Sequence, residues 1–253
     1  MYLPDTFVYL YFMTKKIIIV GATSGIGLEV AKCYIKMGWR VGVAGRREEA
    51  LKALQRTAPE QVVCQVIDVT QGEASVGLSC LIEKLGGMDL FLLSSGIGSQ
   101  NRTLEPEIEL NTVRTNAEGF ARLTTAAYNY FTRQGKGHLA VISSIAGTKG
   151  IGVAPAYSAT KRFQNTYIDA LAQLSRMNKS GICFTDIRPG FVATDLLKDG
   201  HYPMLMDVVE VAAAITRALN RRKRVVIIDG RYRFLVFIWK LIPRWLWERL
   251  PVK

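Results

Sequence analysis

The chain has 253 residues, 49% hydrophobic and 21% charged, a size and composition that suit one α/β domain with a large buried core. Four cysteines without metal-ligand or Cys-x-x-Cys spacing, and only two histidines, make a structural metal site improbable and predict reduced thiols in a cytoplasmic protein. No Gly-x-Ser-x-Gly motif is present, which argues against an α/β-hydrolase.

Residues 1–13 are largely apolar and aromatic, and they lack the basic region and cleavage site of a signal peptide. We interpret them as a loosely attached N-terminal extension or the product of an upstream start. A short contact with a membrane surface is the alternative.

Residues 16–20 form a β-branched run that predicts a buried parallel strand. The run leads into a glycine-rich loop of spacing Gly-x-x-x-Gly-x-Gly and then into residues 28–37, which have helical composition. Backbone amides and a helix N-terminus in this setting can hold a pyrophosphate, and glycine permits the close approach. We therefore predict a dinucleotide site built from Gly21, Thr23, Ser24, Gly25, Ile26 and Gly27.

A second predicted strand, residues 39–44, ends at Gly45 and is followed by Arg46 and Arg47. A carboxylate at this position would bind the adenine ribose and favour NAD, whereas arginine accommodates a 2′-phosphate. The arginine pair therefore favours NADP(H). The alternative is a solvated pair at the start of a helix.

Further strands are predicted at residues 62–67, 89–93, 139–142, 182–187 and 225–228. Their alternation with helical segments predicts an α/β fold with a Rossmann-type, doubly wound parallel sheet in a single domain. We place the catalytic domain at residues 14–230 and a C-terminal tail at residues 231–253.

Ser144, Tyr157 and Lys161 have a spacing that can gather a hydroxyl, a phenol and an ammonium around one carbonyl. If Tyr157 opens a helix, Lys161 lies one turn later on the same face. A nearby ammonium favours the phenolate, so we expect the pKa of Tyr157 to be lowered toward neutrality, where a phenol can transfer protons. Tyr-x-x-x-Lys is also common in ordinary helices.

Together these residues resemble the short-chain dehydrogenase/reductase family over about residues 15–220. The matching positions are Gly21, Gly25 and Gly27 of the cofactor loop, Asp68 and Val69 beside the adenine, Gly96, Asn116, the Ser144, Tyr157 and Lys161 set, and Pro189, Gly190 and Thr194 beside the nicotinamide.

The resemblance implies a role for each residue of the catalytic tetrad. Tyr157 would exchange a proton with the carbonyl oxygen, and Ser144 would donate a hydrogen bond to it. Lys161 would bind the nicotinamide ribose and lower the pKa of the phenol. Asn116 would position a water that links Lys161 to solvent. The nicotinamide itself supplies the hydride chemistry.

One departure from the family lies at Leu93 and Ser94, which replace the two asparagines of an Asn-Asn-Ala-Gly signature. Those asparagines usually support the central sheet through hydrogen bonds. Because the tetrad is complete, we expect activity to be retained.

Residues 195–206 follow Thr194, where the resemblance places the substrate loop. Six of them are apolar or aromatic, and methionine adapts to irregular ligands. A lipophilic ketone fits this composition better than a sugar or an acid. The alternative is that these side chains cover the protein's own core.

The C-terminal part of the chain is basic and aromatic. Residues 221–253 carry ten Lys and Arg against two Asp and Glu, a net +8 of the total +12. The apolar run at residues 234–239 is too short to span a bilayer, which takes about 20 residues. Three interpretations remain: a membrane-surface segment, a lid or dimer contact, and a nucleic-acid patch, which we disfavour because no recognition motif surrounds it.

The sequence thus predicts NADPH-dependent reduction of a lipophilic carbonyl, for example a ketone like 3-ketosphinganine or an acyl-chain ketone. A non-catalytic NADP(H)-binding regulator and a membrane-associated interaction protein are the rivals. Family members often pair through helices that correspond to residues 111–133 and 157–177, so a homodimer or homotetramer is expected, in the cytoplasm or peripherally on a membrane, with no nucleic-acid partner.

Overall fold

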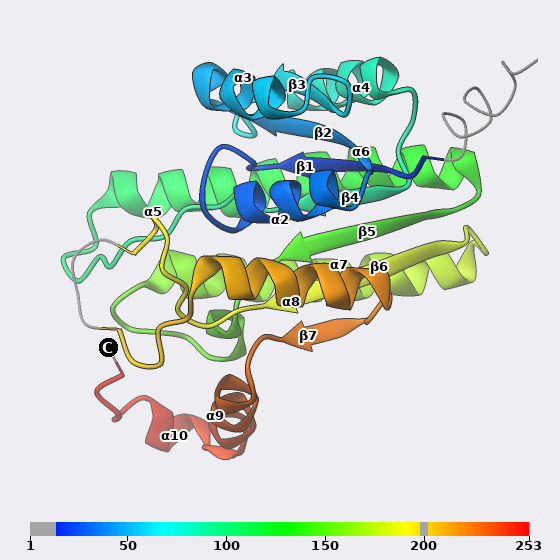
Figure 1. Ribbon diagram of the computed structural model, residues 1–253. Helices are drawn as coiled ribbons and strands as arrows, with labels where there is room; N and C mark the ends of the chain where they lie inside the picture. Colours follow the sequence, from blue (N-terminus) through cyan, green and yellow to red (C-terminus); the bar gives the residue numbers. More distant parts are fainter. Residues whose placement is uncertain (1–13, 198–201, 253) are drawn as a thin grey trace, which may run out of the picture.

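The computed structural model describes residues 14–197 and 202–252. Seven parallel strands form one sheet in the order β3-β2-β1-β4-β5-β6-β7 (Figure 1). They are β1 (Lys16–Val20), β2 (Arg40–Gly45), β3 (Val62–Val66), β4 (Leu90–Leu93), β5 (Gly137–Ile142), β6 (Ile182–Arg188) and β7 (Val225–Ile227). The predicted Rossmann-type fold is confirmed, with each predicted strand present within a few residues of its expected bounds.

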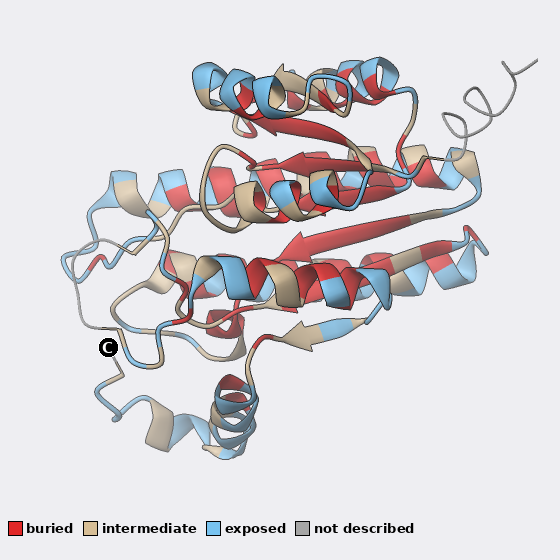
Figure 2. Cartoon of the chain, viewed as in Figure 1, coloured by how far each residue is buried: buried red, intermediate tan, exposed pale blue. Residues whose placement is uncertain are grey.

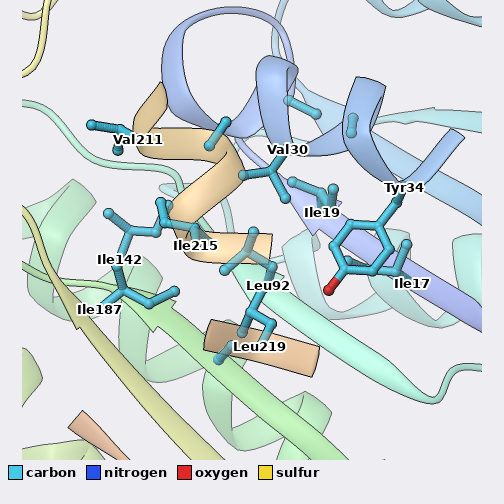
Figure 3. Close-up of a cluster of buried hydrophobic side chains, with 14 of the residues drawn as sticks. Ile17, Ile19, Val30, Tyr34, Leu92, Ile142, Ile187, Val211, Ile215 and Leu219 are labelled. Carbon is cyan, nitrogen blue, oxygen red and sulfur yellow. The ribbon is translucent and has the colours of Figure 1, made fainter. Parts of the chain in front are cut away.

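Helices cover both faces of this sheet because successive strand residues point to opposite sides. One face packs against α2 (Gly25–Lys36), α3 (Glu48–Thr57) and α8 (Val208–Asn220). The other face packs against α4 (Ala74–Leu85), α6 (Phe120–Gln134) and α7 (Pro155–Met177). Figure 3 shows the first core, in which Val30 and Tyr34 of α2 meet Ile215 and Leu219 of α8 over the central strands.

The predicted helix at residues 111–133 is interrupted. It consists of α5 (Pro106–Val113), a π-helical turn η1 (Arg114–Gly119) and α6. π-Turns inside helices are rare and occur often at functional sites. This one contains Asn116, which is fully buried.

The C-terminal segment folds back below β7 as α9 (Gly230–Leu241) and α10 (Arg244–Trp247) (Figure 1). Tyr232 and Val236 of α9 are buried in the core shared with α2 and α8. The opposite side of α9 is exposed, as Figure 2 shows by its pale blue surface. Within the described ranges, no helix combines the length and hydropathy needed to cross a bilayer.

Candidate active site

The glycine loop joins β1 to α2 in a backbone shape that side chains would not fit. Gly21 has φ +90°, and a Cβ there would lie 2.5 Å from the Ser95 nitrogen. A Cβ on Gly27 would lie 2.2 Å from the Gly21 carbonyl oxygen, so the start of α2 packs directly against the loop. The N-terminus of α2 therefore lies against the backbone of the glycine loop. A helix N-terminus in this setting can bind a pyrophosphate.

The arginine pair at the end of β2 lies beside that loop. Arg47 donates to the Thr23 hydroxyl from Nη2 at 3.1 Å and from Nε at 3.3 Å. Burial raises the pKa of the Asp68 carboxyl, but two hydrogen bonds from Thr70 and the charge of Arg46 outweigh it, so that pKa lies below its usual value. Both arginines are exposed.

The segment after β4 lies against the catalytic helices. The Asn116 side chain accepts from the Ile97 nitrogen at 2.9 Å and donates to the Ile97 oxygen at 2.7 Å. A Cβ on Gly96 would lie 3.3 Å from Asn116 Oδ1 and 3.5 Å from Lys161 Nζ. Gly98, which sequence reasoning missed, has no room for a Cβ because the Tyr157 ring would lie 2.6 Å from it.

Ser144, Tyr157 and Lys161 come together as the spacing predicts. Ser144 follows β5, and its hydroxyl lies 3.4 Å from the Pro189 oxygen, which it donates to. Tyr157 and Lys161 share a face of α7, with Lys161 Nζ 5.6 Å from the centre of the Tyr157 ring.

The predicted lowering of the Tyr157 pKa is wrong in this structure. Burial raises the pKa of the phenol, and a hydrogen bond with Ser144 opposes that effect without overcoming it. Burial also lowers the pKa of Lys161 to about 8, against the attraction of Asp186. Desolvation therefore outweighs the attraction between charges at both groups.

A buried polar network behind Lys161 was not predicted. Asp186 on β6 is fully buried and accepts hydrogen bonds from Ser143, from Asn165 at 3.0 Å and from Arg188 at 2.8 Å. Gln164 bonds Lys161 directly. The available signals were an Asp within the mostly apolar run Ile182–Ile187 and the two amide side chains of Gln164 and Asn165, about one turn after Lys161.

The segment after β6 closes the other side of the site. Pro189 accepts from Ser144, and a Cβ on Gly25 would lie 3.3 Å from the Thr194 methyl group, so Thr194 lies next to the glycine loop. A Cβ on Gly190 would collide with the Tyr232 ring at 2.2 Å. The predicted loop 195–206 is closed by a bridge between Val192 and Met206, and residues 198–201 lie outside the described residues.

The predicted site residues thus lie after the carboxyl ends of β1, β2, β3, β4, β5 and β6 or on the helices beside them, at the edge where open parallel sheets bind ligands. This edge offers a glycine cradle for phosphates, arginines at its rim, and a hydroxyl, a phenol and an amine at its inner end. Such a set can bind a dinucleotide and exchange a proton with a carbonyl.

Comparison with known proteins agrees with this geometry. Residues 15–201 match the family described as short chain dehydrogenase. The chain belongs to this family. An uncharacterized oxidoreductase of Myxococcus xanthus is 31% identical over 212 residues, which cover 81% of this chain and 83% of that protein.

Two ketoreductases are also similar. A putative ketoacyl reductase of Streptomyces coelicolor is 32% identical over 203 residues, 76% of each chain. The structure of an actinorhodin polyketide ketoreductase with NADPH superposes with a TM-score of 0.75 at 26% identity and covers 86% of this chain and 96% of that one. The family membership and these neighbours support an oxidoreductase that acts on carbonyl or alcohol groups.

Proposed function

We propose that the protein reduces a lipophilic ketone to an alcohol with NADPH. The observation that carries the proposal is the meeting of Ser144, Tyr157 and Lys161 at the inner end of the glycine-loop edge. A binding protein that only senses the cofactor has no need of this proton-transfer set.

Each catalytic side chain has a role that follows from its surroundings. Burial keeps the Tyr157 phenol protonated at neutral pH, which suits an acid that donates to a carbonyl oxygen. Ser144 adds a hydrogen bond to the same oxygen, and Lys161 supplies positive charge beside the phenol. The bound nicotinamide would supply hydride to the carbonyl carbon.

The preference for NADPH rests on the two arginines at the end of β2. Arg47 is held against Thr23 of the glycine loop, and Arg46 is close enough to Asp68 to lower its pKa. Two guanidinium groups at this rim suit a 2′-phosphate, since they remain charged and can bind it with paired hydrogen bonds. The remaining cofactor contacts are proposed for Thr23, Ser24, Ile26, Val69, Gly96, Pro189, Gly190 and Thr194.

The lipophilic substrate rests on the loop after Thr194. Leu196 is 41% exposed and Leu205 48% exposed, so neither is needed to cover the core. Met206 is buried in the core, and its role is structural. The two ketoreductase neighbours, named for ketone substrates, favour an acyl-chain ketone.

Turnover tests this proposal. Wild-type protein should oxidise NADPH in the presence of long-chain 3-oxo compounds and should prefer NADPH to NADH. Tyr157→Phe should lose about 10²–10⁴-fold in kcat while NADPH binding is kept, since general acid catalysis contributes that much. Turnover confined to water-soluble aldehydes would reject the lipid substrate, and no turnover with any carbonyl would reject the enzyme.

We also propose that α9 and α10 bind an anionic membrane surface. Phe234, Phe237, Leu241 and Trp245 are between 58% and 68% exposed. Their exposed neighbours include Arg231, Arg233, Lys240, Arg244 and Arg249. Exposed aromatic residues beside arginines are typical of interfacial helices that bind anionic head groups.

Vesicle sedimentation tests this surface. Lys240→Gln with Arg244→Gln should weaken binding to phosphatidylglycerol vesicles about fivefold per charge, from about 1 kcal/mol for each basic residue near such a surface. Lys52→Gln with Arg56→Gln on α3 removes the same charge elsewhere and should leave binding unchanged. Equal losses in both double variants, or binding to neutral vesicles alone, would refute the proposal.

Assembly and location are further proposals. Phe163, Leu174 and Met177 of α7 are exposed, which favours pairing with a second copy through α6 and α7. The described cysteines are all free thiols, consistent with the proposed cytoplasmic location.

A further inference from the structure

Gln164 lies one turn beyond Lys161 on α7 and is almost completely buried, with 1% of its surface exposed. Both ends of its side-chain amide are bound. Its Oε1 accepts from Lys161 Nζ at 3.1 Å, and its Nε2 donates to the Asn116 main-chain oxygen at 2.8 Å.

This bridge spans two elements that are distant in sequence. The Asn116 carbonyl belongs to the π-helical turn η1, whereas Lys161 and Gln164 belong to α7. The resemblance implied that a water positioned by Asn116 would link Lys161 to solvent. Here the Gln164 amide connects Lys161 to the backbone of η1 through two hydrogen bonds.

We propose that Gln164 is a positioning residue whose amide ties Lys161 to η1 and holds its amine as an ammonium beside Tyr157. The inference rests on the proposed reduction and adds a residue to it. An amide oxygen accepts from the ammonium without donating back, so it favours the charged amine. An amide is also fixed in place, which a water is not.

Lys161 has few other partners, so its hydrogen bond to Gln164 should influence its protonation. Lys161 also donates to the Ile142 oxygen at 3.2 Å. The nearby titratable groups are Tyr157 on α7 and Asp186 on β6, and Asp186 already accepts from Ser143, Asn165 and Arg188. Burial lowers the pKa of Lys161 to about 8, so loss of one acceptor would matter near physiological pH.

Two substitutions at Gln164 should move this pKa in opposite directions. Gln164→Leu removes the acceptor, so the pKa of Lys161 should fall and the alkaline limb of kcat against pH should move to lower pH. Gln164→Glu places a carboxylate beside the amine, so the pKa should rise and the same limb should move to higher pH. We expect shifts of about one unit, the size of a hydrogen bond to a charged group.

Gln61→Leu is the matched control. Gln61 also donates from its amide to main-chain oxygens, those of Ile35 and Trp39, but it lies in the α3–β3 connection, away from α7 and Lys161. This variant should lose stability without moving the pH profile. A merely structural role for Gln164 would give the same result in all three variants.

The decisive measurement uses the cofactor-free protein. NMR titration of the Lys161 ε-carbon in ¹³C-lysine protein, assigned with Lys161→Arg, reports its pKa without any turnover. Opposite shifts in Gln164→Leu and Gln164→Glu support the proposal, whereas unchanged or parallel shifts overturn it. A wild type that reduces no ketone would instead refute the proposed function, and the NMR result would still decide what Gln164 does to Lys161.

Discussion

The two sides of the candidate active site are built differently. On the predicted cofactor side, β1, β2 and α2 form the site mainly from backbone, and its tightest approach joins Gly21 and Gly27, which are close in sequence. On the substrate side, side chains from the C-terminal segment hold loops that precede them by many residues. Contacts between residues close in sequence produce a recognisable spacing motif. Contacts between distant segments produce no such motif, so they are hard to predict from the sequence.

Tyr232 illustrates the substrate side. Its hydroxyl accepts from the Phe191 nitrogen at 3.0 Å and lies 3.0 Å from the Pro203 oxygen and 3.1 Å from the Met204 oxygen. One phenol therefore ties the segment after β6 to residues 203 and 204 of the proposed substrate loop. Burial raises the pKa of this phenol, so it stays protonated and can donate.

The end of the same segment holds the loop between Ser144 and Tyr157. Lys149 donates to the Ile242 oxygen at 2.8 Å, and the Trp247 indole donates to the Gly150 oxygen at 2.7 Å. A cavity of about 860 Å³ lies between this loop and α10, lined by Arg162, Arg244 and Trp247 among others. The C-terminal helices are thus part of the proposed substrate side and also present an exposed surface.

The largest effect is expected from Gly27→Ala on the cofactor side. Its Cβ would lie 2.2 Å from the Gly21 oxygen, a backbone atom that cannot move without opening the loop. Overpacking of this kind costs about 1–3 kcal/mol, and we expect NADPH binding measured by calorimetry to be lost.

Gly72→Ala is the control for that substitution, because nothing lies within 4 Å of its added Cβ. It should bind NADPH like wild type and unfold at a similar temperature. Normal NADPH affinity in Gly27→Ala would show that the loop is not the cofactor cradle.

The sequence predicted the features that depend on local contacts and missed those that depend on long-range contacts. The strands, the glycine loop and the joining of Ser144, Tyr157 and Lys161 were predictable because each depends on local periodicity or spacing. The interruption at η1 was not, since a π-turn has no spacing signal in residues 111–133. Gln164 was visible three residues after Lys161, but its second partner is 48 residues away and depends on that turn.

The electrostatics were harder to predict than the positions. Spacing places an ammonium near Tyr157, and the expected lowering of the phenol's pKa followed from that charge alone. The extent of burial depends on how Gly98, Ser144 and the surrounding segments pack around the ring. Since desolvation exceeds the attraction here, the direction of the shift needed the folded structure.

A smaller effect is expected from Tyr232→Phe on the substrate side. The ring still fills its space against Gly190, but the Phe191 nitrogen loses its acceptor, and the Pro203 and Met204 oxygens lose the one hydroxyl hydrogen that they share. We expect a loss of about 1–3 kcal/mol in the free energy of unfolding, from a buried donor left unsatisfied. The KM for the ketone should rise several-fold while the Kd of NADPH changes less, because this hydroxyl supports the segment that follows Gly190 but makes no recorded hydrogen bond to the glycine loop or Arg47. Tyr167→Phe, which removes a more exposed hydroxyl bonded to Thr125 at 2.8 Å, should change neither constant. If Tyr232→Phe weakened NADPH and ketone equally, the two sides of the candidate active site would be one coupled unit, and the distinction between them would fail.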